Sequence, residues 1–248
     1  LTMSNLPPMG SISDEDLIVI YDGGVMVENE TIIGVGKFHE IKKHCNNIHE
    51  IDFPCVLLPG FIDCHTHICY AGSRSIEYSK KNAGVSYQKI LAEGGGIYDT
   101  MEKTRLASDE ELIKNTISRL ERHFFEGVLT CEIKSGYGID FDQEIRLLKI
   151  INEINTKHPS SVIPTCLAAH VPPNDSKIST EEYLKLIVKE LFPILRKENL
   201  TNRIDVFIEN NAFKKEESKS YLKFAKEDDF DVTVHANQFT SGGLHVGV

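Results

Sequence analysis

Two histidines separated by one residue, His65 and His67, carry the strongest chemical signal in the sequence. They lie at the end of residues 57–65, which read as a short apolar strand. Side chains alternate between the faces of a strand, so both imidazoles point the same way and can converge on one ion, while Cys64 between them is expected to face the core. Neutral imidazoles are ligands for zinc and iron. Such pairs also occur by chance on surface strands, but this one closes a buried-type strand where α/β enzymes hold their chemistry.

His235 ends another apolar run and is the expected third metal ligand. Zinc or iron held this way lowers the pKa of a bound water, which can then attack an amide or imine carbon. Glu209 ends the preceding expected strand and is either an acid that supports this site or a structural ion-pair partner. Gln238 cannot act as a base, but its amide can orient a polar group of a substrate.

Three more candidate side chains lie on loops after expected strands. Tyr137 stands between two glycines, whose free backbone can present the phenol to a substrate or simply form a flexible loop. His170 lies on a loop stiffened by two prolines, which favours a substrate role over a core role. Arg74 is the cation that a carboxylate substrate would need, although an ordinary surface arginine is the default.

The elements that position these residues follow two patterns. β-Branched runs separated by turn residues at 17–36 predict a small antiparallel β lobe within residues 1–56. In residues 57–248 strands alternate with helices, which predicts an α/β fold with a parallel sheet and active-site residues at the carboxyl ends of the strands, as in a (β/α) TIM-type barrel. The expected strands are 57–65, 128–133, 162–168, 204–209 and 230–235, and the expected helices are 85–106, 108–125, 142–156, 180–197 and 214–226.

Two further signals refine this outline. Ser108 with Glu111 three residues later is a capping-box pattern and predicts a helix start. A closed barrel of this kind needs eight strands, whereas five are expected here. The sequence therefore predicts only about the first five strands of the barrel, in the N-terminal part of a longer enzyme.

The composition excludes several classes of function. The net charge is −10 and no basic block occurs, which argues against nucleic acid and membrane surfaces as partners. No apolar stretch is long enough to cross a membrane, and the N-terminus has no signal-peptide pattern. The six cysteines lack C-x-x-C spacing and fit reduced, mostly buried thiols of a cytoplasmic protein.

Residues 59–67, PGFIDCHTH, resemble the first-strand motif of the metal-dependent amidohydrolase superfamily. Further blocks narrow this resemblance to the imidazolonepropionase family and follow that family's order along nearly the whole chain. These blocks are residues 70–74 (YAGSR), 94–97 (GGGI), 104–105 (TR), 132–138 (EIKSGYG), 169–173 (AHVPP) and 235–238 (HANQ).

The resemblance implies a hydrolase of histidine degradation that opens the ring amide of 4-imidazolone-5-propanoate to give N-formimidoyl-L-glutamate. The attacking group would be water activated as hydroxide by one zinc or iron ion. The implied metal ligands are His65, His67 and His235. The implied substrate-binding residues are Arg74, Tyr137, His170 and Gln238, with His170 and His235 as the catalytic residues. The expected partner is a small anionic substrate, and a homodimer is one expectation for an oligomeric state that the sequence leaves open.

The sequence departs from the family in one respect that matters for the chemistry. Family members are longer, and their last metal ligand is an aspartate on the final barrel strand, which this sequence does not contain. The fourth ligand and the general base are therefore unidentified, and the 248 residues alone are expected to hold metal weakly. Two alternatives stay open: another ring amidohydrolase or aminohydrolase of the same superfamily, or an inactive truncated form with an interaction role.

Overall fold

The computed structural model describes residues 1–7, 10–86, 89–90, 93, 95–138, 140–172, 178–210, 212–238, 240–241 and 243–246. Gly94 and Pro173, which belong to two of the sequence motifs, lie outside the described residues. The chain divides into two compact units, Leu1–Gly60 and Phe61–Val248, and each is described by itself.

The first unit contains an antiparallel hairpin of β1 (Gly23–Glu28) and β2 (Thr31–Lys37), as the sequence predicts. Asn29 and Glu30 form the turn, both with positive φ, which suits a two-residue connection between twisted strands. Residues 17–21, expected as a further strand, are not part of this sheet. Short helical segments complete the unit: η1 (Asp14–Asp16), α1 (Phe38–Ile41) and η2 (Lys42–His44).

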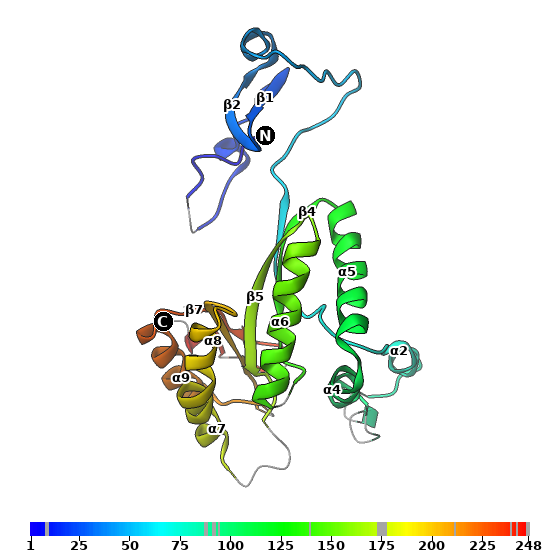
Figure 1. Cartoon of the computed structure of the whole chain (residues 1–248), viewed down its shortest axis with the longest axis vertical. Helices are drawn as coiled ribbons and strands as arrows, with labels where there is room; N and C mark the ends of the chain where they lie inside the picture. Colours follow the sequence, from blue (N-terminus) through cyan, green and yellow to red (C-terminus); the bar gives the residue numbers. More distant parts are fainter. Residues whose placement is uncertain are drawn as a thin grey trace. The chain divides into compact units, whose positions relative to one another are not determined.

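The second unit is built on a curled parallel sheet that forms part of a (β/α) barrel, which confirms the expected fold class (Figure 1). Its strands are β3 (Phe61–Thr66), β4 (Val128–Lys134), β5 (Ser161–Ala169), β6 (Arg203–Ile208), β7 (Asp231–Val232) and β8 (His235–Ala236). They follow one another in chain order from β3 to β7, and β8 also pairs with β6. All pairings are parallel, so the carboxyl ends of the strands lie at one end of the sheet.

Helices accompany this sheet (Figure 1). They are α2 (Ser75–Asn82), α4 (Ile97–Leu106), α5 (Asp109–Phe125), α6 (Phe141–Lys157), α7 (Thr180–Leu186), α8 (Phe192–Lys197) and α9 (Lys215–Glu227), with η3 (Ile187–Leu191) and η4 (Gly243–Val246) between or after them. Of these, α5, α6 and α9 pack against the strands of the sheet. The Ser108 hydroxyl accepts a hydrogen bond from the Glu111 amide, which confirms the predicted start of α5. Leu148, Ile151 and Ile154 of α6 are fully buried. The buried apolar residues form two clusters; Leu148 belongs to one of them, and Ile151 and Ile154 belong to the other.

The first strand of the barrel differs from the sequence expectation. β3 begins at Phe61 rather than at residue 57, and its Ile62 side chain is 70% exposed. Cys64 is exposed as well, so its expected place in the core is wrong. Among the described strands β3 pairs with β4 alone, and an edge strand buries less of its surface than the central strands do.

Two other elements are interrupted. The expected strand 230–235 is split into β7 and β8, because the His235 amide donates a hydrogen bond to the Asp205 carboxylate rather than to a backbone carbonyl. The expected helix 180–197 contains the π-helical turn η3 just before Pro193. Proline has no amide hydrogen to donate to the preceding turn, and this favours a wider turn there.

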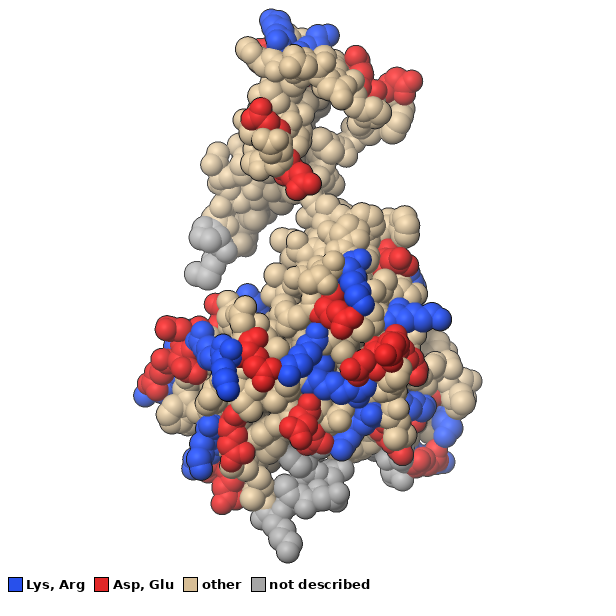
Figure 2. All heavy atoms as spheres, viewed as in Figure 1, with Lys and Arg blue, Asp and Glu red and all other residues tan. Residues whose placement is uncertain are grey.

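The surface of the second unit carries charges of both signs. On the face seen in Figure 2, basic and acidic side chains are interspersed over the helices. Many form ion pairs, such as Lys149 with Glu198 and Arg146 with Asp109. None of the helices in the described part of the chain is long and apolar enough to cross a membrane.

Candidate metal centre

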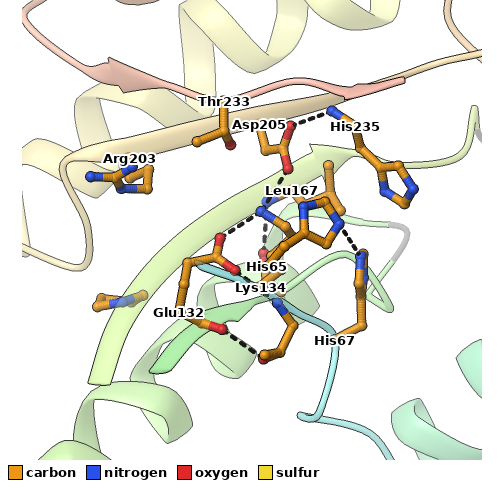
Figure 3. A network of polar contacts seen from close by, with 12 residues as sticks. His65, His67, Glu132, Lys134, Leu167, Arg203, Asp205, Thr233 and His235 are labelled. Carbon is orange, nitrogen blue, oxygen red and sulfur yellow. Dashed lines mark hydrogen bonds and ion pairs between the residues drawn. The ribbon is translucent and has the colours of Figure 1, made fainter. Parts of the chain in front are cut away.

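Three histidines from two distant parts of the chain meet at the carboxyl end of the sheet (Figure 3). His65 lies in β3, His67 directly follows that strand, and His235 begins β8. One potential ligand atom from each residue lies within 4.8 Å of the others. The Nε2 atoms of His65 and His67 are 3.3 Å apart, and the ring centroids of His65 and His235 are 4.8 Å apart. This spacing suits three imidazoles around one ion.

The protonation state of these rings also fits a metal. Burial, followed by the neighbouring histidines, lowers the pKa of His67 to about 2. Burial and His65 lower the pKa of His235. Among the described residues, neither Nδ1 of His67 nor Nδ1 of His235 has a hydrogen-bonding partner, although both atoms are buried. A neutral imidazole nitrogen that is buried and has no hydrogen-bonding partner can instead coordinate a zinc or iron ion.

His170 packs directly against this cluster. Its ring stacks on His67 at a centroid distance of 5.2 Å and lies 6.3 Å from the His235 ring. Nδ1 is 2.8 Å from the carbonyl oxygen of Gly136, which can only accept, so Nδ1 carries the proton. Burial lowers the pKa of His170 to about 4. At neutral pH the ring is therefore uncharged and its Nε2 is an acceptor.

Tyr137 lies beside both rings, with centroids 6.3 Å from His67 and 5.7 Å from His170. Its loop is fixed by the buried carboxylate of Glu144, which accepts hydrogen bonds from the amides of Gly136 and Gly138 at 2.8 and 2.6 Å. Burial raises the pKa of the Tyr137 phenol to about 12, so the hydroxyl stays protonated and can donate.

Gln238 and Arg74 complete the set of predicted site residues. The Gln238 amide oxygen lies 3.0 Å from Nε2 of His235. Arg74 donates from Nε to Glu77 at 2.7 Å, and Glu77 also accepts the amide of Gly96 at 2.7 Å. The charge of Arg74 acts on Tyr137, where it opposes the rise in the phenol pKa. Ring contacts and hydrogen bonds join the four histidines, Tyr137 and Gln238, and Arg74 interacts with Tyr137 through its charge.

Glu209, for which two roles were open, holds the loop that follows β8. Its carboxylate is buried and accepts hydrogen bonds from the hydroxyl and amide of Thr240 at 2.6 and 3.3 Å. These bonds place Glu209 in support of the segment that carries Gln238.

The sequence interpretation missed three buried charged residues next to the cluster, Glu132, Lys134 and Asp205 (Figure 3). Their signal was available in the pattern. Glu132 and Lys134 are two residues apart in an apolar strand and so share a face, and Asp205 interrupts the apolar strand 204–208. Charged residues are almost never fully buried without a partner, so their place in central strands indicates a buried ion-pair network.

Comparison with known proteins agrees with the motifs. No protein-family model matches the chain. An imidazolonepropionase of Bdellovibrio bacteriovorus is 38% identical over 242 residues, covering 96% of this chain and 56% of that protein. An imidazolonepropionase of Streptococcus pyogenes serotype M49 is 42% identical over 192 residues, covering 77% of this chain and 46% of that protein. The chain thus spans about half the length of the curated relatives it matches, and it belongs to the imidazolonepropionase family.

Proposed function

We propose that the protein containing this chain hydrolyses the ring amide of 4-imidazolone-5-propanoate to N-formimidoyl-L-glutamate, with one zinc or iron ion. The observation that carries the proposal is the convergence of His65, His67 and His235 within 4.8 Å. The names of the relatives support the same reaction. The free thiols of all six cysteines support a reducing, cytoplasmic location.

The three histidines are the residues that would hold the ion. A bound zinc or iron ion would supply Lewis-acid activation of water for attack on an amide carbonyl. The lowered pKa values of His67 and His235 keep these two rings neutral at physiological pH, so neither must lose an extra proton when the ion binds.

The remaining residues would bind and orient the substrate. Arg74, held by Glu77, would pair with the propanoate carboxylate through its guanidinium group. Tyr137 would donate its phenolic hydrogen to an acceptor on the ring. His170, protonated at Nδ1, would accept a hydrogen bond or a proton from the ring through Nε2. Gln238, next to His235, would orient a polar group of the substrate.

The test uses the purified product of the complete reading frame that encodes these residues. Imidazolone propionate is added, and loss of its ultraviolet absorbance is followed with and without a chelator. We expect metal-dependent loss that His65→Ala reduces by at least about a hundredfold, because one ligand is removed. His39→Ala, an exposed histidine of the first unit, is the matched control and should retain full activity.

Two outcomes would overturn the proposal. The first is loss of absorbance that neither the chelator nor His65→Ala changes. The second is no turnover of imidazolone propionate together with release of ammonia from a ring amine, which would assign the site to an aminohydrolase.

A further inference from the structure

A completely buried lysine lies beside the histidine cluster (Figure 3). Lys134 ends β4, and its Nζ is 2.5 Å from Oε1 of Glu132 and 2.7 Å from Oδ2 of Asp205. The Lys134 and Asp205 side chains are both 0% exposed. A buried charge is costly without a partner of opposite sign, so each of these three charges relies on its neighbours in the group.

The histidine cluster has two arms: the end of β3 with His65 and His67, and the start of β8 with His235. Each carboxylate of this group accepts a hydrogen bond from the backbone of one arm. Oε2 of Glu132 accepts the Thr66 amide at 3.1 Å, and this amide belongs to the peptide that joins His65 to Thr66. Oδ1 of Asp205 accepts the amide of His235 at 3.1 Å. Lys134 therefore connects the backbone of the β3 arm to the backbone of the β8 arm through two ion pairs.

The charges of the group also favour a cation in the cluster. Two carboxylates and one ammonium leave one net negative charge, and it is buried next to the histidine cluster. Electrostatic attraction is stronger in a buried site than in water, so a divalent ion gains from this charge without direct contact.

We propose that Glu132, Lys134 and Asp205 form an ionic clamp that holds the two histidine arms at ligand spacing and supplies the negative charge that favours the metal ion. Lys134 is then a positioning residue for the metal site. The clamp rests on the proposed metal-dependent function, because it needs the three histidines to be ligands.

The experiment measures the Zn²⁺ affinity of the purified product of the complete reading frame by competition with a chromophoric chelator. Asp205→Asn keeps an oxygen that can accept the His235 amide, but it removes the ion pair and the net negative charge. We expect zinc to bind 10- to 100-fold more weakly, as for other residues that support metal ligands. Asp231→Asn is the matched control, because Asp231 pairs with Arg203 at the surface and its loss should leave zinc affinity unchanged.

A second variant guards against loss of folding. Glu132→Gln, Lys134→Met and Asp205→Asn combined leave no unpaired buried charge, and such neutral replacements of ion triads are often tolerated. The same weakening of zinc binding is expected in this variant, with circular dichroism reporting on its fold. Zinc affinity within twofold of wild type in Asp205→Asn and in the combined variant would overturn the clamp and leave the histidine site standing. Absence of zinc binding in the wild-type chain would instead contradict the proposed function.

Discussion

The Nδ1 atom of His170 donates a hydrogen bond to the carbonyl oxygen of Gly136, at 2.8 Å. This bond joins the loops after β5 and β4, and it fixes which nitrogen of the imidazole carries the proton. Gly136 has φ of +101°, a conformation that residues with a side chain rarely adopt. A methyl group there would lie 2.9 Å from the same Nδ1 atom. The glycine therefore allows both the positive φ of the turn and the close approach of the His170 ring.

Replacement of Gly136 by alanine should therefore be costly. We expect Gly136→Ala to lower the free energy of unfolding by about 2–4 kcal/mol, from backbone strain together with displacement of His170. Gly84→Ala is the matched control, since Gly84 has φ of +85° but no atom within 4 Å of the added methyl group. Urea unfolding should show a larger loss for Gly136 than for Gly84, and equal losses would contradict a role for the contact with His170.

The carboxylate of Glu144 is expected to control the Tyr137 loop. In Glu144→Gln one oxygen becomes an amide donor that faces a backbone amide, so one of the two buried hydrogen bonds is lost. The free energy of unfolding should fall by about 1–3 kcal/mol. Glu153→Gln, an exposed residue of α6, is the comparison and should change it by less than about 0.5 kcal/mol. Similar values for both variants would show that the buried bonds contribute little.

The stability of the metal-free chain should depend on pH through its buried histidines. Folding lowers the pKa of His170 from 6.5 to about 4, so between these values the unfolded chain binds more protons than the folded one. This contribution is complete above pH 6.5 and is lost as the pH falls toward 4, on the order of 3 kcal/mol for His170. Denaturant unfolding at several pH values should show a smaller slope in His170→Asn. An unchanged slope in that variant would contradict the neutral, buried state of the ring.

Arg74 should act on substrate binding rather than on stability. With the product of the complete reading frame, Arg74→Met is expected to raise KM for imidazolone propionate by about 10- to 100-fold, because a charge-assisted pair with the carboxylate is lost. Arg74→Lys should have a smaller effect, since it keeps the charge without the planar fork. Arg122→Met, on the exposed face of α5, serves as the control. An unchanged KM in Arg74→Met would remove Arg74 from the substrate site.

The local sequence pattern was sufficient for the order of strands and helices and for the histidine cluster. His65 and His67 share a strand face, and His235 ends a strand whose carboxyl end lies at the same end of the sheet. Parallel pairing places all three at one end of the sheet, and the curl expected of a barrel brings β3 and β8 together there. The Ser108 cap was predictable for a similar reason, because the bond spans only three residues.

Contacts between residues far apart in the chain were not predictable in this way. Lys134 and Asp205 are separated by 71 positions (205 − 134), and no local periodicity states which buried charge meets which. The break between β7 and β8 follows from the Asp205 side chain replacing a backbone partner, so it was missed for the same reason. The exposure of Cys64 depends on which strands flank β3, and alternation along a single strand does not contain that information.

A Zn²⁺ titration by calorimetry of the product of the complete reading frame tests the metal site most directly. We predict one zinc ion bound per chain in the wild type, and no binding at the same concentrations when His65, His67 and His235 are all changed to alanine. The matched control changes His39, His44 and His49 of the first unit, all of them exposed, and should bind zinc as the wild type does. Equal zinc binding in the wild type and in the variant lacking His65, His67 and His235, or no binding in the wild type, would contradict the metal site.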